Sequence, residues 1–532
     1  MSGLRASRSP GGSLLSTIGL LALVLVAGCG VQVLQRTLLT PDEWLTKRPS
    51  PGREAAPPAF LKAHLRDGRA VILSAWTWDP VTRRVSGTGR SLDVNRNETA
   101  TGPRSVPIDS VALFETNVVG RSSGPIAALS IMTGLSLAAT IYCITDPKAC
   151  FGSCPTFYVS DGERDLLQAE GFSASVSPSL EATDVDALYR ARVRGDTLTV
   201  TMRNEALETH VVRHADLLVA PRGPAGRVFA VVGGGFTAAA DPRAPIRATA
   251  EEGDCLDALR AFDGHERCSA ADSLDLAARE EIALEFAPAD TGRWGLVLAS
   301  RQTLMTTYLF YQALSAMGRS AGAWLAALER GDATTQARSR AMGDELGGIE
   351  VEVRGPDGAW RAAGLTRETG PLATDVRLLA LPPLPAGPVS VRLRMARGAW
   401  RLDWAALARL DGTVEPRRVP PARVRRNGRD EPEALAALRD PERALTTLPG
   451  DTYELLYALP PAIAARPTEL FLESRGYYLE WMRDEWLAGE NPALAALMVT
   501  QPHIALRLLA PAYKSAEPQM ETLFWESRYV RP

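Results

Sequence analysis

The motif with the most recognisable chemistry is Gly318 to Gly322 (Gly-Arg-Ser-Ala-Gly), which matches the G-x-S-x-G pattern of serine hydrolases. That chemistry requires Ser320 on a sharp strand-to-helix turn, with an acid and a histidine elsewhere in the chain. The preceding residues, Tyr311 to Met317, have a helical pattern, and the one histidine downstream is His503. Small residues between two helices explain the match equally well, and we favour that interpretation.

A second candidate is a group of carboxylates near two tryptophans in the C-terminal region. Glycosidases need two carboxylates at a fixed separation across a cleft. The sequence brings acids and aromatic residues together but does not define that separation, and acidic residues on a helix face are usually solvated. The group consists of Glu473, Glu480, Asp484, Glu485, Trp481 and Trp486.

Metal and cofactor sites have weaker support. His210 and His214 are four residues apart, but their flanks are typical of a strand, so the pair does not project as helical metal ligands would. Asp184 and Asp186 do not match a calcium loop. The glycines at 233–235 follow a strand but precede no helix, so they indicate a turn and not a dinucleotide loop. We therefore predict no catalytic, cofactor-binding or metal-binding residues.

The N-terminus has the features of a lipoprotein signal peptide. Arg5 and Arg8 precede an apolar run from Leu14 to Val26, and Leu-Val-Ala-Gly then leads to Cys29. Small residues before the cysteine fit the signal peptidase, and the thiol accepts diacylglycerol. We expect lipidation at Cys29 and a location in the cell envelope, at the outer membrane, its periplasmic face or the cell surface. An ordinary secretory signal is the alternative.

Export permits disulfides, because secreted proteins reach an oxidising environment. Five cysteines remain once Cys29 is lipidated, and the simplest assignment pairs Cys150 with Cys154 and Cys255 with Cys268. Cys143 is then left over as a small buried residue. A metal site is disfavoured because the spacing fits no zinc pattern.

The apolar segment from Pro125 to Ile144 contains twenty residues without a charge, which is long enough to cross a membrane. Its serines, threonines and glycine make it only moderately hydrophobic. A crossing would also place the following cysteines in the reducing cytoplasm. We prefer a buried or membrane-peripheral helix, or an apolar spacer, over a membrane span.

The length of 532 residues suggests about three or four domains. Alternating runs such as Thr197 to Met202 indicate strands, and Thr303 to Glu345 has the one long helical pattern. We predict a mainly β fold, α+β overall, with β-sandwich-like modules, a helical insertion and a helical C-terminal region. The predicted segments are a signal peptide (1–28), a tether (29–58), a small β unit (59–118), an apolar segment (119–145), a β domain with two cysteine pairs (146–300), a helical region (301–345), a β-sandwich-like domain (346–412), a Pro/Arg-rich linker (413–450) and an α+β C-terminal region (451–532).

One stretch carries a recognisable pattern, in which a Ser-Cys-Pro and an aromatic strand lead into an Asp-Gly turn and a later strand pair contains Asn-Glu. It resembles a loose group of uncharacterised bacterial lipoproteins and secreted proteins. The resemblance covers roughly Val106 to Ala220 and implies a fold element and a surface location, but no catalytic residues. The matching residues are Ser153-Cys154-Pro155, Phe157-Tyr158, Asp161-Gly162, Leu180-Glu181, Asp184, Arg203-Asn204-Glu205, Glu208 and Asp216 to Val219.

These features predict a lipid-anchored envelope protein that is a non-enzymatic binding or structural module. The expected partners are the membrane, through the N-terminal lipid, and envelope proteins or glycans. The formal net charge of −3 is too small to indicate nucleic-acid binding. An envelope hydrolase acting on glycan or ester substrates is the alternative.

Overall fold

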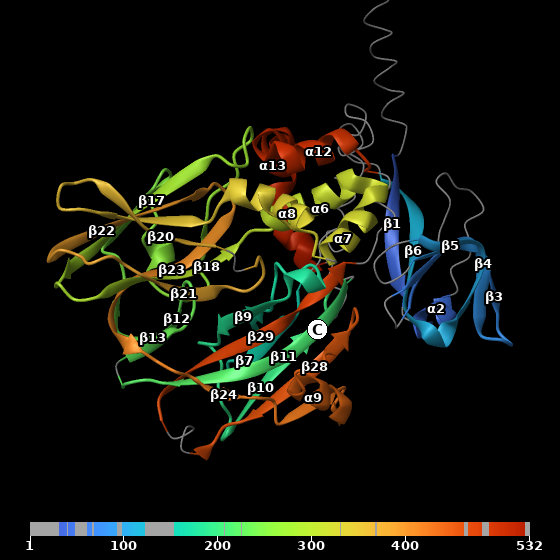
Figure 1. The fold of residues 1–532 in the computed structure, drawn as a ribbon, viewed down its shortest axis with the longest axis horizontal. Coiled ribbons are helices and arrows are strands. Elements are labelled where there is room, and N and C mark those ends of the chain that lie inside the picture. Colours follow the sequence, from blue (N-terminus) through green and yellow to red (C-terminus); the bar gives the residue numbers. More distant parts are fainter. Residues whose placement is uncertain are drawn as a thin grey trace, which may run out of the picture.

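The computed structural model describes a mainly β protein with several helices, which confirms the predicted fold class. Its strands form five sheets within the described part of the chain (Figure 1). The described residues are 31–39, 41–47, 61–65, 69–92, 98–122, 154–206, 208–224, 226–329, 331–367, 370–461, 466–480 and 489–526. The segment 125–144 and Cys29, Cys143 and Cys150 lie outside them.

The N-terminal sheet has six strands in the order β1-β6-β2-β3-β4-β5. Part of the predicted tether belongs to this sheet, because β1 pairs with β6 along its whole length. The valines and leucines of that segment favour a strand, and without it β6 would be an edge. The elements are β1 (Val31–Leu39), α2 (Pro41–Lys47), β2 (Leu61–Leu65), β3 (Ala70–Asp79), β4 (Arg84–Leu92), β5 (Glu98–Pro107), the 3₁₀ turn Ile108–Ser110 and β6 (Val111–Ser122).

Two sheets, drawn in green and orange in Figure 1, face each other and form a sandwich around a shared apolar core. A turn at Asp161-Gly162 joins the two strands that come first in the chain, β7 and β8, as the sequence predicts. The first sheet contains β26 (Arg429–Asp430), β25 (Arg423–Arg426), β28 (Thr452–Ala458), β10 (Thr197–Arg203), β7 (Thr156–Ser160) and β8 (Asp165–Glu170). The second contains β24 (Arg417–Val419), β11 (Glu208–Pro221), β29 (Thr468–Glu480), β9 (Ala182–Ala187) and β27 (Leu445–Thr447).

The predicted linker at 413–450 is part of this sandwich and not a solvated connection. β24 pairs with β11, and β25 pairs with β28. Val419 and Val424 are buried in the core, so apolar residues between the arginines and prolines hold the segment in place. The segment ends with α9 (Pro432–Arg439) and β27, which also pack on the sandwich.

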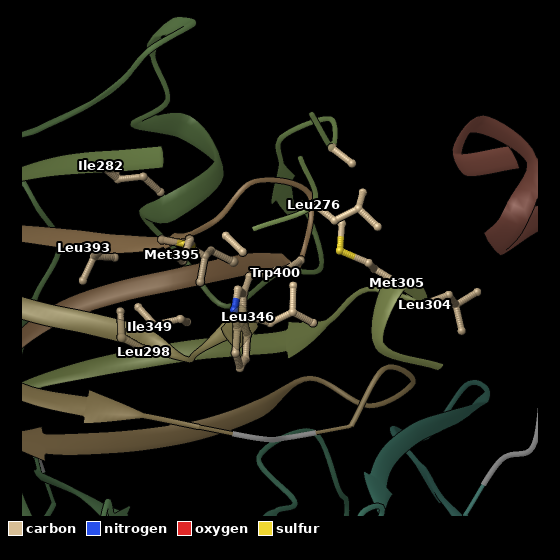
Figure 2. Packing of buried hydrophobic residues seen from close by; sticks show 14 of the residues in the cluster. Leu276, Ile282, Leu298, Leu304, Met305, Leu346, Ile349, Leu393, Met395 and Trp400 are labelled. Atoms are coloured by element: carbon tan, nitrogen blue, oxygen red, sulfur yellow. The ribbon is translucent and has the colours of Figure 1, made fainter. Parts of the chain in front are cut away.

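Two further six-stranded sheets form another compact unit beside the sandwich, and this unit is called the second body. One consists of β13 (Phe236–Arg243), β12 (Gly226–Val231), β21 (Asp375–Ala380), β18 (Trp294–Gln302), β23 (Trp400–Thr413) and β16 (Arg267–Cys268). The other consists of β15 (Gly253–Asp254), β14 (Arg247–Ala250), β17 (Arg279–Ala289), β22 (Gly387–Ala396), β19 (Ile349–Arg354) and β20 (Trp360–Thr366). Figure 2 shows that their core continues into the helices, since Leu298 of β18, Leu393 of β22 and Met305 of a helix share one cluster.

A helical layer packs beside the sandwich and the second body (Figure 1). It confirms the predicted helical insertion and C-terminal helices. Asp332 and Asn491 cap two of its helices by accepting N–H groups of the first turn. Its members are α6 (Met305–Met317), the 3₁₀ turn Gly318–Ser320, α7 (Ala321–Glu329), α8 (Ala333–Leu346), α12 (Pro492–Thr500) and α13 (Pro502–Glu526); two more 3₁₀ turns elsewhere are Pro178–Leu180 and Asp257–Leu259. Among the described helices, none is long and apolar enough to cross a membrane.

Candidate functional site

The greatest concentration of chemically capable side chains lies at one end of the sandwich. There the first residues of β7 and β11 meet the last residues of β8, β10 and β29. Four glutamates, each no more than 1% exposed, are placed there: Glu170, Glu205, Glu208 and Glu480. Burying carboxylates is costly unless protein groups replace the hydrogen bonds to water, so their contacts define what this site does.

Glu208 and Glu480 are direct cross-strand partners on β11 and β29, and His210 and Tyr478 are the next such pair on the same face. The Nε2 atom of His210 lies 2.8 Å from Oε1 of Glu208. The hydroxyl of Tyr311, on α6, donates a hydrogen bond to Glu480. The two glutamates are thus held by a histidine of the sandwich and a tyrosine of the helical layer.

Glu205 is bonded to the aromatic strand β7. Its Oε2 atom accepts hydrogen bonds from the hydroxyls of Thr156 and Tyr158, both at 2.9 Å. The guanidinium of Arg203 lies 4.4 Å from the centre of the Tyr158 ring and adds a cation–π contact. The Asn-Glu and aromatic residues of the sequence pattern are therefore neighbours in space.

Glu170 connects the sandwich to the second body. It accepts the backbone N–H groups of Leu372 at 2.7 Å and Ala373 at 3.3 Å, and the thiol of Cys154 lies 3.5 Å from it. Burial raises the pKa of Glu170 to about 7. Burial, with the nearby Glu170 and Glu208 carboxylates, also raises the pKa of the Cys154 thiol well above its ordinary value. That thiol stays protonated at neutral pH and is a poor nucleophile.

Apolar side chains from the helical layer close this end of the sandwich. Cys154 and Tyr478 pack with Leu328 of α7, and Phe310 and Trp324 lie against them. The Tyr478 hydroxyl donates to the carbonyl of Ser173 at 3.0 Å. A carboxylate that acts on a substrate must touch it, whereas these carboxylates touch strands, a loop and a helix of their own chain. The arrangement joins the helical layer and the second body to the sandwich.

Ser320 lies on the 3₁₀ turn between α6 and α7, and its hydroxyl donates to the carbonyl of Met317 at 2.7 Å. No strand enters this turn, so the strand-to-helix geometry of a nucleophilic serine is not formed. The interpretation of the motif as small residues between helices is confirmed.

The C-terminal carboxylates do not form a facing pair. Glu473 and Glu480 are seven residues apart on β29, so they project from opposite faces of the sheet. Glu473 lies 3.0 Å from His214 and 2.5 Å from Arg418, in an ion cluster. The other members of the predicted group, Asp484, Glu485, Trp481 and Trp486, lie outside the described residues.

A β-bulge separates His210 from His214. The register between β11 and β29 shifts between Val212 and His214, which places the two histidines on opposite faces. The glycines at 233–235 all have positive φ and form the turn between β12 and β13, as predicted. No group of three His, Cys, Asp or Glu side chains in the described chain is arranged to hold a metal ion.

The predicted disulfide between Cys255 and Cys268 is not formed, and Cys154 is also a free thiol. Cys255 is buried directly after β15, whereas Cys268 is exposed on β16, and these strands belong to different sheets. Closeness in sequence therefore does not bring the two sulfur atoms together.

Sequence reasoning named Cys154, Glu205 and Glu208 only as parts of a pattern and missed Glu170 and Tyr311 as members of the site. One signal was present. Along β29 the inward positions run Leu470, Leu472, Ser474, Gly476, Tyr478 and Glu480. Glu480 falls on the side of the strand that faces the core, and an acid at such a position indicates a buried carboxylate that needs a hydrogen-bond partner.

No protein-family model matches the chain, and no match was found among curated proteins. Among solved structures, one comparison is with dimeric latent PorU from Porphyromonas gingivalis, at 10% sequence identity and a TM-score of 0.12. The alignment covers 96% of this chain, which spans 41% of the length of that chain. A TM-score this low gives no basis for relating the two folds.

Proposed function

We propose that the chain is a lipid-anchored cell-envelope protein that acts as a non-enzymatic binding or structural module. The predicted signal peptide, 1–28, directly before Cys29 supports the anchor and the location. The mainly β architecture supports the module, since such sheets commonly present recognition loops on a rigid frame.

The burial of the four glutamates carries this proposal. Glu170, Glu205, Glu208 and Glu480 are carboxylates of the kind that acid–base chemistry uses, and each is almost fully buried and bonded to its own chain. Glu170 bonds the second body and Glu480 bonds the helical layer, so these two stabilise the joints to the sandwich. Glu205 and Glu208 are bonded within the sandwich itself. Recognition then falls to the exposed loops, and we expect envelope proteins or glycans as partners.

The arginine-rich strands do not favour a polyanionic partner. Arg418 pairs with Asp216 at 2.9 Å, Arg423 pairs with Asp430 at 2.7 Å, and Arg426 pairs with Asp451. The positive charge of these strands is therefore largely compensated within the sandwich, which argues against binding to anionic lipid through this face.

The anchor is tested by labelling cells that produce the full-length chain with radioactive palmitate. We expect the wild-type protein to carry label and Cys29→Ala to carry none, because the lipid is attached through that thiol. Cys268→Ala, which removes an exposed thiol of the second body, is the matched control and should label like the wild type.

Equal labelling of Cys29→Ala and the wild type would remove the anchor from the proposal. A separate experiment tests the proposal that the protein is not an enzyme. Turnover of ester or glycan substrates by the purified protein, lost in a folded Glu208→Gln or Glu480→Gln variant, would show that the buried cluster is catalytic.

A further inference from the structure

A second group of buried acids lies where the sandwich meets the second body. Glu170 ends β8 and Asp184 and Asp186 lie on β9, all in the sandwich. Asp375 and Arg377 lie on β21 of the second body, which contacts β9 (Figure 1). Four carboxylates from two bodies thus lie at one contact. Arg377 interacts with the three aspartates, and Glu170 acts on the same cluster through Asp184 and Asp186.

The guanidinium of Arg377 is shared between the two bodies. It bonds Asp375 on its own strand and reaches Oδ1 of Asp184 across the contact at 3.3 Å. Asp186 is 2% exposed, and its Oδ2 atom has no hydrogen-bond partner among the described residues. Arg377 therefore bonds two of the carboxylates, and neither of these bonds reaches Asp186.

Glu170 fixes the same contact from the other side. The loop that offers its N–H groups, 370–374, is held within the second body: the N–H of Gln302 donates to the carbonyl of Gly370, and Arg301 donates to the carbonyl of Pro371. The bonds from Leu372 and Ala373 to Glu170 therefore link a loop that is bonded to the second body with the sandwich.

We propose that this contact is a pH-sensitive joint, in which the surplus of carboxylates over the single guanidinium holds the two bodies together best when some of those carboxylates carry protons. The inference goes beyond the proposed function and does not depend on it. It gives the buried acids a regulatory role: the joint is tight in mildly acidic surroundings and loosens as the pH rises.

The direction follows from the charges that face one another. If all four carboxylates were ionised, they would exceed Arg377 by three negative charges in a largely buried site. Burial raises the pKa of Asp186, and neighbouring Asp184 and Asp375 raise it further. Burial also raises the pKa of Asp184 against the opposing effect of Arg377. Among the described residues, Cys154 lies beside Glu170, and Tyr189 lies near Asp375 and Arg377. The nearby cations are already paired: Arg227 with Glu469, and Arg301 with Glu266 and Glu521.

The sign is set by the raised pKa values. The folded state binds more protons than the unfolded state between the ordinary pKa of Glu170, 4.5, and its folded value of about 7. The contribution of Glu170 is therefore fully present below 4.5 and is lost as the pH rises through about 7.

Hydrogen exchange of the full-length protein, measured at about pH 5.5 and about pH 8.5 and corrected for intrinsic rates, tests the joint. We expect the amides of β9 and β21 to lose protection about tenfold at the higher pH, the factor for one pKa unit. Strands β3 and β4 of the N-terminal sheet should keep theirs. Glu170→Gln and Asp186→Asn, which cannot ionise, should each reduce the loss at β9 and β21.

The exposed residue Glu163, in the turn after β7, gives the matched control, and Glu163→Gln should behave as the wild type. Equal protection of β9 and β21 at both pH values would overturn the proposal. So would an undiminished loss in both variants, or the same reduction in Glu163→Gln. If Glu170→Gln does not fold, Asp186→Asn decides the outcome alone.

Discussion

Arg301→Ala is expected to lower the free energy of unfolding by about 3 kcal/mol, the lower end of the range for breaking a buried ion pair. Arg301 is nearly buried and donates to both oxygens of Glu266, each at 2.7 Å, to Glu521 of α13 at 2.9 Å and to the carbonyl of Pro371 at 2.7 Å. The Arg301→Ala substitution therefore removes the bidentate hydrogen bonding to Glu266. Arg401 remains 2.9 Å from Glu521 and 3.7 Å from Glu266, which moderates the loss.

Urea unfolding monitored by tryptophan fluorescence measures this effect. Arg301→Lys should lose about half as much, because an ammonium keeps the charge but not the planar fork that binds a carboxylate with two bonds. The matched control is Arg361→Ala, which breaks a single exposed pair with Asp357 and should change stability by less than about 0.5 kcal/mol. A similar small change in Arg301→Ala would show that the network is not structural.

The second large effect is a pH dependence that Glu170 imposes on stability. Its pKa rises from 4.5 to about 7 on folding, and 1.36 kcal/mol per unit gives a loss of roughly 3 kcal/mol as the pH rises through this window. Glu170→Gln keeps a carbonyl oxygen for the N–H groups of Leu372 and Ala373 but cannot ionise. The variant should therefore lack this part of the pH dependence and be more stable than the wild type above about pH 8.

Urea midpoints across the pH range decide this prediction, with Glu163→Gln as the control that should follow the wild-type curve. Parallel curves for the wild type and Glu170→Gln would mean that Glu170 does not carry a raised pKa. A wild type that gains stability relative to Glu170→Gln as the pH rises between these values would reverse the predicted sign.

Local patterns predicted the class of the fold, because the formation of strands, helices and turns depends mainly on residues that are close in sequence. The alternation at Thr197 to Met202 is strand β10, and the small residues at Gly318 to Gly322 separate two helices. The Asp161-Gly162 turn also follows from short-range chemistry, because a glycine accepts a positive φ without strain.

Pairings between distant segments could not be obtained in this way. Glu208 becomes a neighbour of Glu480 only because β11 pairs with β29, and nothing in either strand specifies the other. The Pro/Arg-rich segment at 413–450 has the composition of a linker, yet Val419 and Val424 of its short strands are buried in the core. Composition averages over a window, whereas burial depends on individual residues.

The cysteines show the same limit. Cys255 and Cys268 are close in sequence, and a disulfide between them is the simplest prediction. The chain between them instead passes from one sheet of the second body to the other, and the two thiols remain free. Spacing alone does not determine the separation of two side chains.

We infer a structural and not a catalytic role for Glu480, which joins the helical layer to the sandwich as Glu170 joins the second body to it. A double-mutant cycle between Tyr311→Phe on α6 and Glu480→Gln on β29 measures this role, because these side chains form a hydrogen bond between the helical layer and the sandwich. We predict a coupling free energy of about 1 to 3 kcal/mol in urea unfolding. A coupling within about 0.3 kcal/mol of zero would contradict the claim.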